Sequence, residues 1–599
     1  MEDKSLKQRD QIPEEYKWRL EEIYANDEMW EQDFVKIKEI LPRMEEFRNK
    51  LGDSPQDLLN CLRLQDEIGQ ISDKVFVYAS MRKDENNAKA QYQGMRDQAQ
   101  SLMVTIGEAL SFIQPEILAI DPQTLEGFLN REPGLSLYRF YLEEILRMKE
   151  HTLSPREEEI IAMTGELGAG PKNIFSMLNN ADLKFPEITD EDGDRVALTH
   201  GNYIKFMESE KRQVRMDAFK ALYDTYGKQK NTLGALLSTS VKKDIFYARV
   251  HKYPSALEAS LYDDNVPVRV YDNLIKTVRS RLGLFYRYVA LRKRLLQLPE
   301  LHMYDIYAPL VKEMKRKITY EDAVTMVEKG LAPLGERYLS DLKKGIRSGW
   351  VDVMENEGKT SGAYSWGAYG THPYVLMNYQ NNLDNVFTLA HELGHSLHSY
   401  YSWQTQPYIY AYYKIFVAEV ASTVNETLLT KYLLANASDK KEKMYLINHY
   451  LEEFRGTVFR QTMFAEFEKI IHEKAEAGEP LTCEGFSEIY YQLNKDYYGP
   501  DMVVDQEIAL EWARIPHFYN AFYVYKYATG FSAASALAQG ILDEGQPAVE
   551  RYLEFLQSGG SDYPINLLQK AGVNMNEPEP IEQALKVFEE MLEEMEKMI

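Results

Sequence analysis

The sequence predicts a mainly α-helical protein with a small β element. Over most of its 599 residues, apolar side chains recur at helical spacing, as at Leu59, Leu62, Ile68 and Ile71. These runs break at prolines, which lack the backbone N–H that a helix interior needs. Examples are Pro55, Pro122 and Pro155. With 44% hydrophobic residues, the chain can bury a large core without a metal or disulfide.

Two stretches depart from the helical pattern. Residues Phe185 to Ile188 and Val196 to Thr199 flank the turn-forming pair Asp192-Gly193, which predicts a short β-hairpin. Further on, residues 358–370 hold four glycines in thirteen positions, which disfavours a helix. The strand-forming run His372 to Tyr379 follows directly. A strand is therefore expected just before the next helical run.

That next run, Asp384 to Tyr400, has helical periodicity, with Asp384 as a plausible N-cap. It contains the pattern HExxH, formed by His391, Glu392 and His395. Residues four apart share a helix face, so both imidazoles can point at one metal ion, while Glu392 lies about 100° round the helix and can reach a metal-bound water. The small residue Gly394 would let another segment approach closely.

A catalytic zinc site needs a third protein ligand and keeps a fourth position for water. The metzincin pattern requires Gly at 398 and His at 401, whereas this sequence has His398 and Tyr401, so that class is excluded. A carboxylate on the next helical run, Tyr412 to Tyr432, is the remaining choice. Glu419 and Glu426 lie seven residues apart there, on a similar face, and geometry alone does not choose between them.

The stretch TLAHELGHSLHSYYS, followed by FVAEVASTVNE, resembles the M3 family of zinc oligopeptidases, specifically its bacterial oligoendopeptidase F branch. Segments ADLKFPEI, LTHGNY, PHFYNAFYVYKYATG and IPEEYKWRLEEIY share the likeness. In that family a Glu that opens an ExxS-like motif follows the second His. The resemblance therefore implies Glu419, followed by Ser422, as the third metal ligand, with a structural or outer-shell role for Glu426. We expect His398 to be a packed, hydrogen-bonded histidine.

A histidine and tyrosines near the C-terminus are the candidates for stabilising the oxyanion. Tyr519, Tyr523 and Tyr527 are four residues apart and would share a helix face, a spacing that by itself favours core packing. In M3 enzymes, however, a His and one or two Tyr close over the substrate carbonyl, which implies His517, Tyr523 and Tyr527. Where longer family members carry a further tyrosine, this sequence has Gly530. Which tyrosine donates therefore stays open.

The resemblance also implies two helical lobes around a deep substrate channel, with one Zn²⁺ per chain at its floor. We expect an N-terminal lobe over residues 1–195, including an oligoendopeptidase F-type region at 115–185, and a catalytic region over 196–599. The implied function is a metalloendopeptidase that cuts internal bonds of short oligopeptides, with Glu392 as general base. A peptidyl-dipeptidase or carboxypeptidase with the same zinc set, or an inactive peptide-binding scaffold, are the alternatives; retention of Glu392 argues against the scaffold.

The segments before the HExxH helix are expected to contact substrate. In zincins the preceding strand lies along the cleft edge, so a peptide would add to His372 to Tyr379 through backbone hydrogen bonds, with broad sequence tolerance. The glycine-rich residues 358–370 are interpreted as a mobile loop over the cleft, with an ordinary surface loop as the alternative. They lack the order of a phosphate-binding loop, which disfavours nucleotide binding.

Charge, cysteine content and hydropathy indicate which binding partners and which cellular compartment are expected. The net charge of −24 disfavours nucleic acid and anionic membranes. The two cysteines, Cys61 and Cys483, are too few for a disulfide framework and predict reduced thiols. Residues Met1 to Lys17 lack the apolar stretch of a secretory signal, and the least polar stretch, Ala528 to Leu542, is too short for a membrane span. A cytoplasmic enzyme is expected; the sequence makes no prediction of its oligomeric state.

Overall fold

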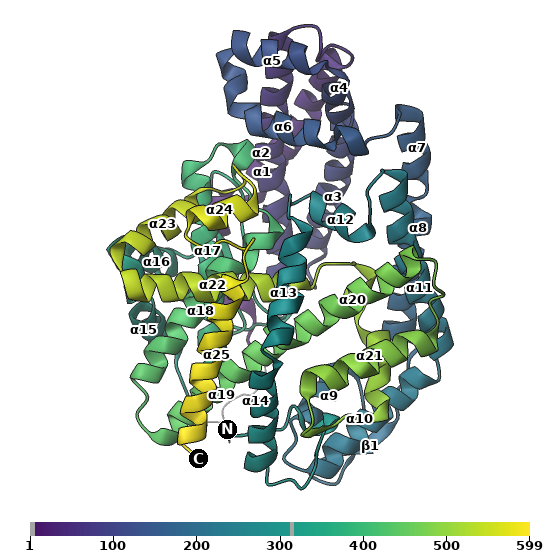
Figure 1. Ribbon diagram of the computed structural model, residues 1–599. Coiled ribbons are helices and arrows are strands. Elements are labelled where there is room, and N and C mark those ends of the chain that lie inside the picture. Colours follow the sequence, from purple (N-terminus) through teal and green to yellow (C-terminus); the bar gives the residue numbers. More distant parts are fainter. Residues whose placement is uncertain (1–5, 312–316) are drawn as a thin grey trace. The chain divides into compact units, whose positions relative to one another are not determined.

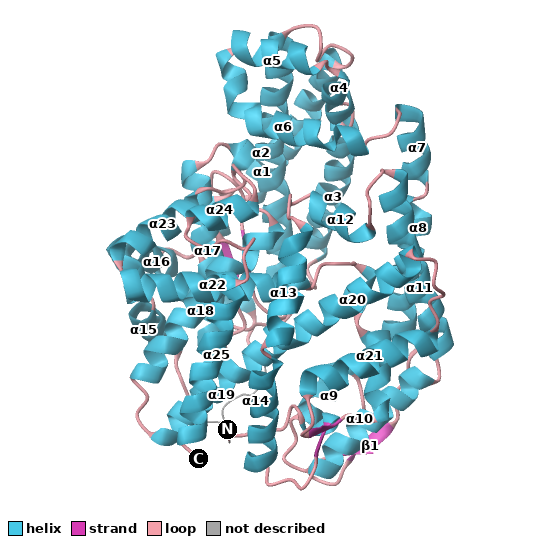
Figure 2. Cartoon of the chain, in the orientation of Figure 1, coloured by secondary structure: helices cyan, strands magenta, loops and turns pink. Residues whose placement is uncertain are grey.

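The computed structural model describes residues 6–311 and 317–599, and helices dominate this range (Figures 1 and 2). Residues 1–5, the start of the segment Met1 to Lys17 that is expected to lack a secretory signal, lie outside the described residues. The chain divides into two compact units, each built from three stretches. Unit 1 comprises Met1–Thr152, Arg316–Tyr432 and Leu537–Gly572, and unit 2 comprises Leu153–Lys315, Leu433–Ala536 and Val573–Ile599. The lobe boundary near residue 195 stays a prediction.

Unit 1 contains the helices of the first stretch and those around the HExxH motif. They are α1 (Asp27–Ile40), α2 (Pro55–Glu85), α3 (Ala90–Leu110), α4 (Ile113–Ala119), α5 (Pro122–Arg131), α6 (Arg139–Arg147), α15 (Tyr320–Gly330), α16 (Gly335–Arg347), α17 (Leu383–Thr405), α23 (Gln546–Gln557) and α24 (Pro564–Lys570). The predicted breaks are helix starts, because Pro55 and Pro122 occupy the first turns of α2 and α5, after the N-caps Ser54 and Asp121.

Unit 2 contains the remaining helices, apart from two that extend across the division. Its members are α7 (Pro155–Met163), α8 (Gly165–Met177), α9 (His200–Met207), α10 (Arg212–Gly227), α11 (Lys230–Val250), α12 (Ala256–Tyr262), α13 (Val268–Ser280), α14 (Leu282–Leu295), α19 (Lys440–Phe454), α20 (Arg460–Glu476), α21 (Cys483–Tyr498) and α25 (Glu579–Lys597). The division of the chain falls within α18 (Ala418–Ala435) and α22 (Tyr525–Glu544).

Two short pairs of strands lie in unit 2. The predicted hairpin is confirmed as β1 (Glu187–Thr189) and β2 (Arg195–Ala197), which pair antiparallel. Gly193 in the turn has a φ of 94°, in the left-handed region that glycine enters without steric cost. Strands β3 (Leu301–His302) and β7 (Met502–Val503) pair in parallel.

Unit 1 holds a three-stranded sheet of β4 (Val351–Asp352), β5 (Tyr364–Trp366) and β6 (Tyr374–Leu376), in the order β4-β6-β5. The predicted strand 372–379 is confirmed over its middle as β6. Its expected role as the peptide-binding edge is wrong, because β4 pairs along one side of β6 and β5 along the other. The outer strands are therefore β4 and β5, and β5 lies inside the glycine-rich residues 358–370.

The glycine-rich residues are tied to the rest of unit 1 by buried polar contacts. The Lys359 side chain is fully buried; its Nζ lies 2.6 Å from Asp352 Oδ1 and donates to the Met354 carbonyl at 2.7 Å. The hydroxyls of Thr360 and Tyr364 donate to the carboxylate of Asp84 at 2.7 and 2.8 Å. These contacts fix the position of β5 at the sheet.

One described stretch, Ala90–Ala119, is long and apolar enough to cross a membrane by length and composition. It consists of α3 and α4, separated by a turn at residues 111–112. Helix α3 packs against α2 and buries Met95, Ala99 and Leu102 in the core of unit 1. Core helices of folded domains pass the same composition test, so this stretch is weak evidence for a span.

Candidate active site

The HExxH motif lies on α17, as predicted, but the helix begins earlier than its sequence suggested. Asn382, not Asp384, is the N-cap: its side chain accepts a hydrogen bond from the Asn385 N–H at 2.9 Å. Asn381 adopts a φ of 59°, which turns the chain into the helix. Asp384 instead occupies the first turn, where its negative charge suits the helix dipole.

Three donor atoms converge where α17 meets α18. Nε2 of His391 and Nε2 of His395 lie 3.2 Å apart, and Oε2 of Glu419 lies 3.4 Å from the first and 3.3 Å from the second. All three ligand atoms fall within 4.8 Å of one another. The structure therefore brings together two imidazoles and the carboxylate that the family resemblance selected.

The close approach of α17 to α18 depends on Gly394. A Cβ atom at this position would lie 2.7 Å from the Ala421 carbonyl oxygen and 2.7 Å from Ser422 Cα. The two helices are also joined by Asn425, whose amide donates to the Ala390 carbonyl at 3.0 Å. The Tyr338 hydroxyl donates to the Asn425 side-chain oxygen at 2.8 Å. Sequence reasoning missed Asn425 and Tyr338, because their partners lie on other helices.

A second layer of contacts orients the three donors. Glu426 Oε1 lies 3.1 Å from His391 Nδ1, and the Ser422 hydroxyl donates to Glu419 Oε2 at 3.1 Å. Burial disfavours a charged His391, but the hydrogen bond to Glu426 and the charges of Glu426, Glu392 and Glu419 together outweigh burial and raise the pKa of His391 to about 9. Burial also acts to raise the pKa of Glu419, but the hydrogen bonds with His395 and Ser422 and the charges of the two histidines together outweigh burial and lower that pKa to about 2.

Two further residues of α17 complete this part of the site. Glu392 is only 7% exposed, and burial raises its pKa above the usual value against the opposing effect of His391 and His395. His398 is packed as expected, with its ring stacked on Tyr413 at 3.7 Å. Its Nδ1, however, has no hydrogen-bond partner among the described residues, and burial lowers the pKa of His398 to about 3. His398 is therefore a neutral, packed side chain.

In unit 2, the structure brings His517, Tyr523 and Tyr527 together. The ring centroids of His517 lie 6.2 Å from Tyr523 and 6.1 Å from Tyr527, and the two tyrosine rings meet edge-to-face at 5.5 Å. Burial, together with the charge of Arg460, lowers the pKa of His517 below its usual value. A neutral imidazole thus stands beside two phenol rings.

The expectation of a shared helix face for Tyr519, Tyr523 and Tyr527 is wrong. Residues Pro516–Tyr519 form a 3₁₀ turn, a loop follows, and α22 begins only at Tyr525. Tyr519 is buried, and its ring stacks on the Phe175 ring with the centroids 4.5 Å apart. At Gly530 a Cβ atom would meet nothing within 4 Å.

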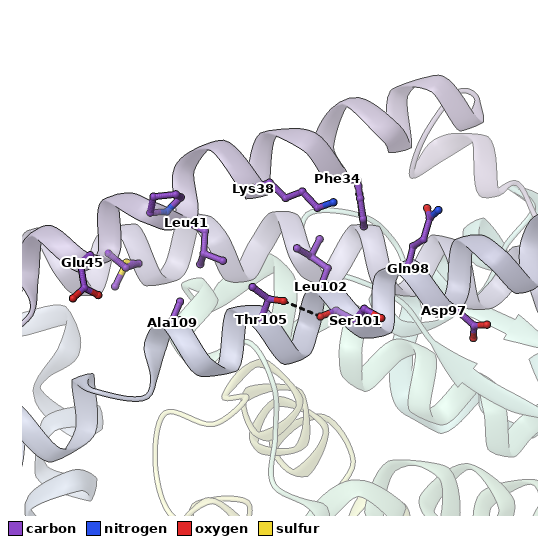
Figure 3. A pocket seen from close by; sticks show the side chains of 12 residues that line it. Phe34, Lys38, Leu41, Glu45, Asp97, Gln98, Ser101, Leu102, Thr105 and Ala109 are labelled. Carbon is purple, nitrogen blue, oxygen red and sulfur yellow. Dashed lines mark hydrogen bonds between the residues drawn. The ribbon is translucent and has the colours of Figure 1, made fainter.

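A hollow of about 640 Å³, distinct from the donor cluster, lies in unit 1 (Figure 3). Helix α3 forms one side of it, and α1 with the following residues Leu41–Phe47 forms the other. Phe34 and Leu41 point toward Leu102 across it, and the Thr105 hydroxyl is bonded to the Ser101 carbonyl of its own helix. The described residues that line it include neither His nor Cys. It therefore lacks the donor set found at α17 and α18.

Comparison with known proteins gives the class of the protein. Residues 205–587 match the model of peptidase family M3, and residues 116–185 match that of oligopeptidase F. The chain belongs to the M3 peptidase family, and it is a metalloendopeptidase. Within the family it belongs to the oligoendopeptidase F branch, whose members hydrolyse oligopeptides.

Relatives match along nearly the whole chain. Oligopeptidase PepF of Bacillus subtilis is 53% identical over 594 residues, covering 99% of this chain and 89% of the relative. Group B oligopeptidase PepB of Streptococcus agalactiae is 42% identical, covering 99% and 98%. The crystal structure of oligoendopeptidase-F from Enterococcus faecium is similar with a TM-score of 0.75 at 38% identity, covering 96% and 99%. The mainly helical fold is thus shared with this branch.

Proposed function

We propose that this chain hydrolyses internal bonds of short oligopeptides by a zinc-dependent reaction, with the metal held by His391, His395 and Glu419. The observation that carries the proposal is the convergence of these three donor atoms within 4.8 Å on two closely packed helices. Membership of a family that is zinc-dependent in general supports it.

The donor set fits zinc. Two imidazoles, which would be neutral with the metal bound, and one carboxylate form a set typical of catalytic zinc sites, which leave a position for water. Glu426 is placed to orient His391, as carboxylates beside metal-binding histidines do. Mn²⁺ or Co²⁺ suit the same donors and are further candidates. When bound, the metal would polarise the scissile carbonyl and make water a stronger acid.

In this proposal Glu392 transfers protons and the unit 2 residues bind the oxyanion. Glu392 takes a proton from the attacking water and returns it to the leaving amine nitrogen, a role that the raised pKa of this carboxyl supports. His517, Tyr523 and Tyr527 supply N–H and O–H donors for the negative charge that develops on the carbonyl oxygen. The lowered pKa of His517 keeps its imidazole neutral, with one N–H to donate.

Strand β5 replaces β6 as the proposed docking edge for the substrate backbone. It is an outer strand, and the hydroxyl of Ser365 on β5 lies 2.8 Å from that of Ser396 on α17, the residue after His395. A peptide paired with this edge would be held mainly by backbone hydrogen bonds, so side-chain preference would be broad.

We also propose a cytoplasmic location. Both Cys61 and Cys483 are free and buried, and burial raises the pKa of the Cys61 thiol to about 12. Such thiols are protonated and unreactive, which suits a reducing compartment.

The test compares wild type with Glu392→Gln on a mixture of short peptides, longer peptides and a folded protein, with and without a zinc chelator. Products are identified by mass spectrometry. Internal cuts confined to the shorter peptides, lost with chelator and in the variant, are expected, with zinc content unchanged in Glu392→Gln. Release of C-terminal dipeptides or single residues alone would identify an exopeptidase, and intact peptides despite bound zinc would refute the proposal.

A further inference from the structure

The segment that carries His517 and Tyr523 rests on one face of α20. Phe518 packs against two side chains of that face, with ring centroids 5.4 Å from Phe464 and 5.1 Å from Phe467. One helical turn further along α20, two polar residues face the end of the same segment. They are Glu468 and His472, and both are buried.

The backbone of this segment is strained at Phe522, the residue before Tyr523. Phe522 has a φ of 60°, a left-handed conformation that brings the Cβ atom of a non-glycine residue too close to its own backbone. Its ring is 1% exposed and lies 4.5 Å from the His472 ring and 5.9 Å from the Tyr271 ring. Strain of this kind persists only where the surroundings hold it, and it gathers at functional sites.

The hydrogen bond that holds Phe522 comes from a buried carboxyl group. Oε1 of Glu468 accepts the Phe522 N–H at 3.1 Å, while Oε2 has no hydrogen-bond partner among the described residues. Burial, aided by the charge of Asp244, raises the pKa of Glu468 well above its usual value. His472 Nδ1 donates to the Glu468 backbone carbonyl at 2.8 Å, and its Nε2 lies 3.5 Å from Asp244 Oδ2.

We propose that Glu468 is a positioning residue of the peptidase reaction: by accepting the Phe522 N–H, it holds the left-handed turn that places Tyr523 and Tyr527 against His517. A buried carboxyl with one unpaired oxygen is unfavourable for folding, so its presence here calls for an explanation other than stability. Without the acceptor, Phe522 is free to leave the strained conformation, and the direction of Tyr523 relative to His517 changes with it. This inference rests on the proposed role of these three residues in catalysis.

The test uses variants that separate the acceptor from the volume of the side chain. Glu468→Gln keeps an oxygen that accepts the Phe522 N–H, whereas Glu468→Met fills similar space without one. Glu468→Asp keeps the carboxyl but withdraws it by one methylene, and serves as a second variant if Glu468→Met does not fold. Thr462→Val is the matched control, because Thr462 is also buried on α20 and its hydroxyl has no hydrogen-bond partner among the described residues.

Two readouts are needed: kcat and KM on a fluorogenic peptide with zinc content measured, and hydrogen exchange of the peptide covering residues 516–525. For Glu468→Met and Glu468→Asp we expect faster exchange in this peptide and a kcat lowered by about tenfold or more, with KM and zinc content little changed. For Glu468→Gln and Thr462→Val we expect wild-type exchange and kcat.

A purely structural role would lower the melting temperature of Glu468→Met and leave kcat of the folded enzyme unchanged, which would overturn the inference. Unchanged exchange in both acceptor-deficient variants would also overturn it. A wild-type protein that binds zinc but cleaves no peptide would refute the proposed function instead, and the exchange data would then show by themselves whether Glu468 holds the turn.

Discussion

Replacing Gly394 with alanine tests how closely α17 and α18 must pack to form the donor cluster. The added Cβ atom would lie 2.7 Å from the Ala421 carbonyl oxygen and 2.7 Å from Ser422 Cα, both backbone atoms of α18. Ordinary contact begins at 3.4 Å, so α18 must move locally by about 0.7 Å, the difference between 3.4 and 2.7. This shift carries Glu419, whose Oε2 lies 3.3 Å from His395 Nε2.

The shift should affect the metal site more than stability. Overpacking costs about 1–3 kcal/mol, and the better helix propensity of alanine offsets about 1 kcal/mol of that cost. Misplacement of a catalytic group by about 1 Å can reduce a rate by about 100-fold. For Gly394→Ala we therefore expect weaker zinc binding and a kcat/KM lowered by about 10- to 100-fold.

Zinc affinity is measured by competition with a chelator, kcat/KM with a quenched fluorescent peptide, and stability by thermal unfolding. Gly107→Ala is the matched control, because Gly107 lies inside α3 of the same unit and a Cβ there would meet nothing within 4 Å. This control should bind zinc as wild type and be slightly more stable. Wild-type zinc affinity and kcat/KM in Gly394→Ala would refute the packing argument.

Three further predictions follow from contacts around the two sites. Glu426→Ala removes the partner of His391 Nδ1 and should lower metal affinity by about 10- to 100-fold in a zinc titration, with the fold intact by circular dichroism. Lys359→Met removes a buried cation from Asp352 and should lower the free energy of unfolding by about 3 kcal/mol. Urea denaturation measures this change, and an unchanged unfolding midpoint would contradict it. Burial acts to raise the pKa of Glu511, but the charges of Arg460 and Arg514, with hydrogen bonds from Arg460 and Tyr490, together outweigh burial and lower that pKa to about 2. The stability from this carboxylate is therefore present above its unfolded pKa of about 4.3 and lost as pH falls toward 2. The difference in melting temperature between wild type and Glu511→Gln should narrow over that range and stay constant above it.

The two histidines of the donor cluster could be predicted because their spacing is local information. HExxH places His391 and His395 on one face by helix geometry alone, and the small size of Gly394 already indicated a close helix contact. The choice of Glu419 over Glu426 came from the family resemblance, since both lie on the same face of α18. The structure shows what the second carboxylate, Glu426, contacts: the other ring nitrogen of His391, Nδ1.

Elsewhere, non-local contacts decided the structure and the sequence pattern misled. Asn382 and Asp384 are both suitable N-cap residues for α17, and the backbone turn at Asn381 makes Asn382 the N-cap. Strand β6 was expected at the edge by analogy with zincins, and its partner β4 is only two residues long, so no sequence pattern warned against this expectation. The spacing of Tyr523 and Tyr527 suggested one helix, although the chain turns sharply before α22.

The two groups of candidate functional side chains are held by different kinds of contact, and each depends on a residue that takes no part in the proposed chemistry. At the donor cluster of His391, His395 and Glu419 the decisive feature is an absent side chain, because Gly394 lets two backbones meet. At the aromatic group it is a buried acceptor, because Glu468 holds a backbone conformation that Phe522 would otherwise leave. Substitutions at these two positions should therefore impair turnover by separate routes: at Gly394 zinc affinity falls, whereas at Glu468 zinc is retained and kcat falls.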